Sequence, residues 1–187
     1  MAKITFITGG ARSGKSTLAE ELVRQKGEHI LYIATAKAID EEMAERIRRH
    51  RSQRPSQWDT LEAYQGLGAV LPEKSRQYQG MLLDCVTIMS TNLLFDQPAL
   101  AKEEMTVEDM NEAEEAVLAE IDRLIAAFPR LEADLILVSN EVGFGLVPEY
   151  PLARFFRDVL GRVNQRLATA ADEAYLVVSG LTVKLKG

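Results

Sequence analysis

The segment Gly9–Ser16 reads Gly-Gly-Ala-Arg-Ser-Gly-Lys-Ser and has the spacing G-x-x-x-x-G-K-[ST]. An apolar run precedes it and a helical pattern follows it, which is the context in which this motif binds nucleotide phosphates. Its glycines let consecutive backbone N–H groups turn toward phosphate oxygens, and the following helix would add the positive end of its dipole. We expect Lys15 to neutralise the outer phosphates and the Ser16 hydroxyl to bind Mg²⁺. The predicted phosphate-binding residues are Gly9, Gly10, Ala11, Arg12, Ser13, Gly14, Lys15 and Ser16.

Short apolar runs elsewhere in the chain predict buried strands. They are nearly continuous rather than alternating, which is typical of parallel strands covered on both faces. A final run, Val183–Lys186, follows the turn signal Ser179-Gly180 and is predicted to pair as an edge hairpin. The main predicted strands are Ile4–Thr8, Ile30–Ala34, Met81–Cys85, Leu135–Ser139 and Tyr175–Ser179.

Helical patterns separate these runs. Asp40 is placed to cap one helix, and Thr106 to cap a long helix whose apolar residues recur at spacings of three and four until Pro129. Strands that alternate with helices predict an α/β fold with an open, mostly parallel sheet. We find no linker or repeat, so residues 1–187 are expected to form a single domain. The predicted helices are Ser16–Lys26, Asp40–Arg51, the segment after Thr106, and Leu152–Ala170.

Composition excludes several classes of protein. A chain of 187 residues with 47% hydrophobic and 27% charged residues is neither disordered, nor collagen-like, nor stapled by disulfides. The single cysteine, Cys85, has no partner for an internal disulfide, which suits a reducing cytoplasm. No apolar run approaches the length of about 18 residues that a membrane span needs, so we expect no span and no signal peptide.

The charge is unevenly distributed. The net charge is −6, yet Glu103–Asp122 alone contains nine acidic residues and no basic one. The remainder is therefore mildly basic, and five of its arginines lie between Arg46 and Arg54. An acidic chain argues against general nucleic-acid binding but leaves room for a local anion site.

The two histidines lie in different surroundings. His29 precedes a strand in a polar loop and is expected at the surface. His50 follows Met43 and Ile47 at helical spacing, which favours packing, but arginines flank it. Guanidinium groups would favour the neutral, nucleophilic imidazole and attract a polyphosphate. The pattern alone leaves both interpretations of His50 open.

Acidic residues follow two of the predicted strands. A phosphate-binding loop needs an acidic partner for its metal, usually at the end of a neighbouring strand, and Asp84 is the best candidate. The alternative for Asp84 is capping of the next helix. Asn140-Glu141 should lie at the carboxyl edge of the sheet, where open α/β folds bind ligands, with capping or support of a metal ligand as the alternative.

A set of motifs makes the sequence similar to a known family from nearly one end to the other. The motifs are Gly9–Ser16; Tyr32–Ala36; Asp40 with Arg46–Arg51; Arg54-Pro55, Trp58, Thr60 and Glu62; Leu83–Thr87 and Asn92–Leu94; Ser139–Gly143 with Val147-Pro148; and Gly161, Asn164-Gln165 and Ala171-Asp172. In this ordered set the chain resembles the bifunctional adenosylcobinamide kinase / adenosylcobinamide-phosphate guanylyltransferase family of cobalamin biosynthesis.

The resemblance implies a RecA-like P-loop NTPase fold and two reactions. ATP or GTP would phosphorylate the aminopropanol hydroxyl of adenosylcobinamide, and GTP would then guanylylate adenosylcobinamide phosphate to give adenosylcobinamide-GDP and pyrophosphate. GMP would pass through a histidine that matches His50, and the family's oligomers imply a homotrimer. Family members often carry Glu where this chain has Asp84, which leaves the reach of this carboxylate open. The nucleotide contacts implied beyond the P-loop are Thr35, Ala36, Lys37, Arg51, Ser52, Gln53, Arg54, Glu62 and Asp84.

The residue types suit this chemistry. A neutral imidazole nitrogen can attack the α-phosphorus of GTP, while Lys15 and Mg²⁺, held by Ser16 and Asp84, would stabilise the leaving pyrophosphate. His50 and Lys15 are thus the expected catalytic residues, and no base for the kinase step is evident. Two alternatives stay open: a P-loop small-molecule kinase with a structural His50, and a nucleotide-dependent regulatory switch.

Overall fold

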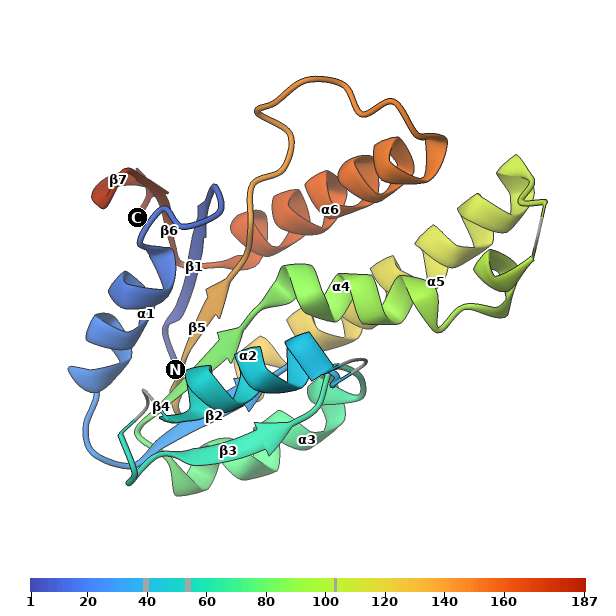
Figure 1. The fold of residues 1–187 in the computed structure, drawn as a ribbon. Coiled ribbons are helices and arrows are strands. Elements are labelled where there is room, and N and C mark those ends of the chain that lie inside the picture. Colours follow the sequence, from blue (N-terminus) through green and yellow to red (C-terminus); the bar gives the residue numbers. More distant parts are fainter. Residues whose placement is uncertain (39–40, 53–54, 103) are drawn as a thin grey trace.

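The chain folds into one twisted sheet with helices on both faces (Figure 1). The computed structural model describes residues 1–38, 41–52, 55–102 and 104–187. In helix α2 (Glu41–Ser52) the structure describes the backbone throughout but not the side chains of Met43, Arg46, Arg49, His50 and Ser52.

The sheet is parallel except at one edge. Its strand order is β3-β2-β4-β5-β1-β6-β7, and only the β6–β7 pair is antiparallel. The strands are β1 (Ile4–Gly9), β2 (Ile30–Ala34), β3 (Asp59–Glu62), β4 (Gly80–Asp84), β5 (Asp134–Val138), β6 (Glu173–Val178) and β7 (Leu181–Lys186).

The continuous apolar runs arise because alternate residues of each central strand enter two different cores. In β1, Phe6 packs on one face and Ile7 on the other; in β5, Leu137 and Val138 divide in the same way. Both faces of these strands are covered, so both sets of side chains must be apolar.

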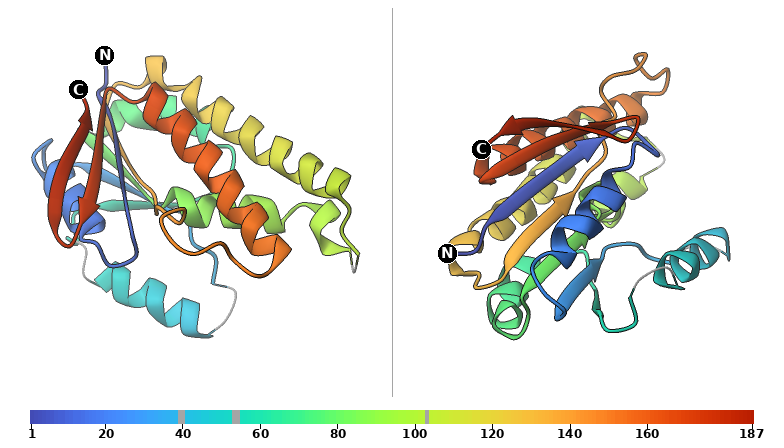
Figure 2. Two further views of the ribbon diagram at one scale, coloured as in Figure 1. Left: turned by 90° about the horizontal axis from the view of Figure 1, so that it is seen from above. Right: turned by 90° about the vertical axis from the view of Figure 1, so that its left-hand side faces the viewer.

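The two faces are covered unequally (Figure 2). One face packs against four helices, and the other against α1 (Lys15–Arg24) together with Trp58. In both views of Figure 2, α2 projects away from the other helices. The four helices are α3 (Leu67–Lys74), α4 (Val86–Phe95), α5 (Val107–Ile125) and α6 (Pro151–Ala170); the short 3₁₀ helices are η1 (Ser75–Gln77), η2 (Pro98–Ala101) and η3 (Phe128–Arg130).

Most predicted elements are confirmed, with boundaries that differ by a few residues. Thr106 caps α5 through a capping box with Asp109, but the helix ends at Ile125, before the predicted stop at Pro129. The predicted N-cap Asp40 lies outside the described residues. The C-terminal hairpin is confirmed, and its turn residues Ser179 and Gly180 both have positive φ, 52° and 80°, as a type I′ turn requires.

One strand and two α-helices of the described residues are absent from the sequence-based expectations, β3, α3 and α4, as are the three short 3₁₀ helices. β3 has only four residues and contains no apolar run, while α3 has Pro72 in its interior. Among the helices in the described ranges, none combines the length and apolar composition needed to cross a bilayer.

Candidate active site

The site residues gather where the parallel strands end. The register aligns Glu62 of β3 and Asp84 of β4 with Ala34 of β2, and Asp84 with Val138 of β5. Gly9 ends β1 at the same edge and begins the P-loop, Gly9–Ser16. The predicted site residues in the P-loop, after β2, and at the ends of β3 and β4 therefore share the carboxyl edge of the sheet, as expected for an open α/β fold.

The P-loop is tightly wound between β1 and α1. A Cβ atom on Gly9 would lie 2.3 Å from the carbonyl oxygen of Val177, so no larger residue fits there without movement of β6. Helix α1 begins after Gly14 with no side-chain cap, which leaves N–H groups of its first turn available to an anion. Gly10, Ala11 and Arg12 form the exposed part of the loop.

Lys15 folds back across this loop. Its side chain is buried, and Nζ donates to the carbonyl oxygen of Gly10 at 3.0 Å. Burial lowers the pKa of Lys15, while the neighbouring Cys85 and Asp84 act in the opposite direction. A phosphate group could replace the Gly10 carbonyl as the partner of this ammonium, and its negative charge would offset the loss of hydration that lowers the pKa.

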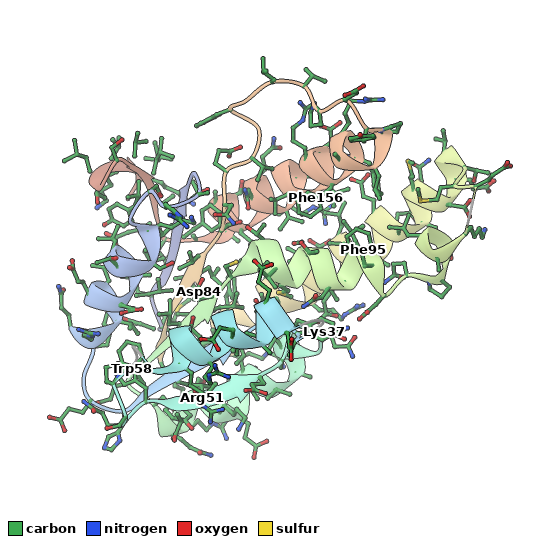
Figure 3. All side chains as sticks on the ribbon, in the orientation of Figure 1. Lys37, Arg51, Trp58, Asp84, Phe95 and Phe156 are labelled. Atoms are coloured by element: carbon green, nitrogen blue, oxygen red, sulfur yellow. The ribbon has the colours of Figure 1, made fainter. Side chains whose placement is uncertain are left out.

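Asp84 lies on the α1 side of the sheet, at the point where β4 passes into α4 (Figure 3). Tyr32 donates its hydroxyl to Oδ2 of Asp84 at 2.8 Å. The N-cap of α4 is Cys85, so the capping alternative for Asp84 is wrong. The acidic partner was expected at the end of a strand next to the P-loop strand β1, and this is wrong. β5 lies between β4 and β1, so Asp84 approaches Lys15 from two strands away.

The segment after β2 is fastened to β4 and α4. The Thr35 hydroxyl donates to the Cys85 carbonyl and accepts from the Cys85 N–H, at 2.8 and 2.9 Å. Asn92 donates to the Thr35 carbonyl at 2.7 Å. The side chain of Thr35 is therefore occupied within the protein, while the next residue, Ala36, is half-buried at the edge.

Lys37 binds an acidic side chain in this structure. Its ammonium contacts both carboxylate oxygens of Asp96, at 2.8 and 2.9 Å, and lies 4.2 Å from the ring centre of Tyr64. Tyr64 donates to the same carboxylate at 2.7 Å. The hydrogen bond from Lys37 lowers the pKa of Asp96, with a second contribution from Tyr64. A nucleotide that engages Lys37 must compete with Asp96.

Two further predicted contacts meet beside α2. Arg51 and Glu62 form an exposed ion pair at 3.8 Å, so the end of α2 approaches the end of β3. The backbone of His50 lies in α2, but its side chain is outside the description, as is that of Ser52. Gln53 and Arg54 lie wholly outside the described residues.

The structure reveals two supports of the site that sequence reasoning missed. The turn of the C-terminal hairpin braces the P-loop, because Gly180 donates its N–H to the Ser13 carbonyl at 2.8 Å. The second support lies just beyond β5. There the side chain of Asn164 of α6 accepts a hydrogen bond from the Ser139 hydroxyl and donates one to the Asn140 carbonyl. No local pattern signals either contact, since each joins segments far apart in the chain.

The oxygen donors at the edge have the chemistry that Mg²⁺ prefers. Ser16 contributes a half-buried hydroxyl in the first turn of α1, and Asp84 a carboxylate beside Lys15. Within the described ranges no three His, Cys, Asp or Glu side chains form a metal cluster. Mg²⁺ at phosphoryl-transfer sites takes one or two protein carboxylates and completes its shell with phosphate oxygens and water, so this donor pair fits.

Comparison with known proteins gives consistent results. Residues 5–185 match the family described as cobinamide kinase / cobinamide phosphate guanyltransferase. The bifunctional adenosylcobalamin biosynthesis protein CobU of Escherichia coli K12 is 50% identical over 181 residues, covering 97% of this chain and 98% of that protein. The corresponding protein CobP of Pseudomonas aeruginosa is 39% identical over 183 residues, covering 97% and 96%.

A solved structure supports the fold. The RadB recombinase superposes with a TM-score of 0.50 at 13% identity, covering 93% of this chain and 73% of that one. At this identity the similarity concerns the fold alone. The predicted RecA-like α/β fold with a C-terminal edge hairpin is confirmed.

Proposed function

Because the chain belongs to the cobinamide kinase / cobinamide phosphate guanyltransferase family, we propose that it catalyses both reactions. ATP or GTP phosphorylates the aminopropanol hydroxyl of adenosylcobinamide. The phosphorylated product then accepts GMP from GTP, which gives adenosylcobinamide-GDP and pyrophosphate.

One observation supports the nucleotide chemistry most directly: the buried Lys15 donates to the Gly10 carbonyl within the P-loop, at the edge of the sheet where Asp84 ends β4. A cation held beside a carboxylate at a helix N-terminus suits a nucleotide triphosphate with its metal. The exposed Gly10–Arg12 segment leaves the loop accessible to a ligand.

In the kinase step the protein mainly positions reactants and neutralises charge. The P-loop N–H groups would hold the phosphates while Lys15 contacts the outer ones. Ser16 and Asp84 would hold Mg²⁺, which supplies additional neutralisation of phosphate charge when bound. Tyr32 fixes the orientation of the Asp84 carboxylate through its hydrogen bond.

In the guanylyl transfer His50 would attack the α-phosphorus of GTP and carry GMP as a phosphoramidate. The arginines that flank His50 in the sequence would favour its neutral form and attract the triphosphate. Arg51 already approaches the carboxyl edge through its ion pair with Glu62. The proposed contacts beyond the P-loop are Thr35, Ala36, Lys37, Arg51, Ser52, Gln53, Arg54, Glu62 and Asp84.

Both activities would share one domain, residues 1–187, which acts in the cytoplasm as a homotrimer. Apolar side chains on the hairpin support self-association: Val178, Leu181 and Val183 are at least 50% exposed, and Leu185 is 59% exposed. Large exposed apolar patches commonly mark protein contacts. Light scattering on the purified protein would give a trimer mass, and a monomer at micromolar concentration would contradict this part.

The function is tested by following the corrinoid with mass spectrometry. Wild-type protein with adenosylcobinamide, GTP and Mg²⁺ should give first the phosphate and then the GDP derivative. His50→Ala should stop at adenosylcobinamide phosphate, because the kinase step does not use the imidazole. Formation of the phosphate alone by wild-type protein would support the single-activity kinase instead, and no turnover would refute the proposal.

A further inference from the structure

Glu141 lies beside the P-loop but has no role in the function described so far. It follows β5, which pairs with β1 on one side and β4 on the other, so it emerges between the P-loop strand and the Asp84 strand. Its N–H donates to the Gly9 carbonyl at 3.0 Å. The backbone of Glu141 is thus fixed against the first residue of the phosphate-binding loop.

A buried hydrogen-bond network holds the preceding residues in place. Ser139 donates to Asn164 at 2.6 Å, and Asn164 donates to the Asn140 carbonyl at 3.0 Å. The Asn140 N–H donates to Thr87 at 2.7 Å. This network ties the end of β5 to α4 and α6, and a fully paired buried network favours one conformation. Glu141 therefore projects from a rigid base, although it begins a loop.

The side chain of Glu141 is half-buried, and part of its accepting capacity is unused. Oε1 accepts the N–H of Gly143 at 2.7 Å. Within the described residues no Lys, Arg or His pairs with this carboxylate, and Oε2 has no hydrogen-bond partner. A carboxylate with a free oxygen can accept a proton, whereas one engaged by a cation is a poorer base.

The other carboxylates at this edge are less suited to that task. Asp84 accepts the Tyr32 hydroxyl and interacts with Lys15, while Glu62 pairs with Arg51 on the edge strand β3. Beyond Gly143 the loop exposes Phe144 and Leu146, so an organic acceptor can meet apolar surface close to Glu141. In Figure 1 this loop, drawn in orange, leaves the end of β5 and arches above α6.

We propose that Glu141 is the general base of the kinase step. Its carboxylate accepts the proton of the acceptor hydroxyl as the hydroxyl oxygen bonds to the γ-phosphorus of the nucleoside triphosphate. The bond between that phosphorus and the bridging oxygen breaks, the nucleoside diphosphate leaves, and the proton passes from Glu141 to solvent. The assignment rests on the proposed function and deepens its first reaction only.

The variant Glu141→Gln tests whether the carboxylate acts as a base or only holds the loop. The amide oxygen of Gln can still accept the Gly143 N–H, but the amide cannot accept the proton of the hydroxyl. The expected result is a fall of about 100-fold or more in kcat for phosphorylation of adenosylcobinamide, the typical contribution of a general base. KM for the nucleotide and the yield of guanylylated protein from GTP should stay at wild-type values. Glu141→Asp retains a carboxylate and should recover part of the lost rate.

The matched control is Glu149→Gln, which removes an exposed carboxylate of the same loop and should leave kcat unchanged. Wild-type kcat in Glu141→Gln would overturn the assignment, as would an equal loss in both reactions, which indicates a structural role. If wild-type protein forms no phosphorylated corrinoid, the proposed function itself fails. That outcome is distinct from an active wild type with an equally active Glu141→Gln.

Discussion

At the scale of single residues, Lys15 carries the largest expected effect on nucleotide binding. Lys15→Ala should weaken GTP binding about 10- to 100-fold, because a charge-assisted contact to phosphate contributes about 1.5–3 kcal/mol. Both reactions should slow. Isothermal titration with GTP measures the affinity. Lys26→Ala is the control, since Lys26 pairs with Asp134 beyond the opposite end of α1; unchanged binding in Lys15→Ala would refute its phosphate role.

The residues of the P-loop were predictable because one short, continuous segment, Gly9–Ser16, supplies all of the loop's phosphate-binding groups. Asp84 was also predictable as the acid that ends an apolar run, but its distance from Lys15 across β5 was not. Its Tyr32 partner lies 52 positions away and is joined to it only by the pairing of β2 with β4. Long-range partners of this kind carry no local signal.

At the scale of elements, the C-terminal hairpin supports the site from outside it. Gly180→Ala should destabilise the protein by about 1 kcal/mol, because Gly180 has φ of 80° and a Cβ atom disfavours that conformation. GTP affinity should also fall, because a turn that relaxes away from this φ would move the residue 180 N–H that donates to the Ser13 carbonyl. Thermal unfolding with and without GTP measures both effects.

The control for this variant is Gly161→Ala in the middle of α6, where an added Cβ meets nothing within 4 Å. Alanine at a helix interior should raise stability by about 1 kcal/mol, the opposite sign. Equal stability of Gly180→Ala and the wild type would show that the turn does not need glycine.

Strands marked by a continuous apolar run and helices marked by a periodic apolar pattern were predictable, whereas β3, which has neither, was not. The run Ile30–Ala34 is predicted and observed with the same limits, because both of its faces are buried. β3 was missed since its four residues, Asp59–Glu62, are exposed or half-buried and gain their strand form from pairing with β2. Neighbouring structure, rather than propensity, decides such short edge strands.

At the scale of the whole molecule, Glu173 joins the two ends of the chain. Its carboxylate pairs with Lys3 and Lys184, each at 3.0 Å. These two hydrogen bonds lower the pKa of Glu173 to about 2 from 4.5. A lowered carboxyl pKa stabilises the fold above about pH 4.5, and this contribution is lost as the pH falls toward 2.

Glu173→Gln should therefore reduce the free energy of unfolding at pH 7 by about 1 kcal/mol, a modest value because both lysines are partly exposed. The difference from wild type should shrink as the pH falls below 4.5. Urea unfolding at several pH values measures it. A difference that is constant with pH would show that the ion pairs are not its source.

The proposed guanylyl transfer requires a covalent intermediate at His50, and labelling with GTP that carries a radioactive α-phosphate tests for it most directly. We predict label on denatured wild-type protein, released by acid as a phosphoramidate requires and absent from His50→Ala. His29→Ala, which changes the only other histidine, should label normally. Label that persists in His50→Ala, or a wild-type protein that takes up none, would contradict the account.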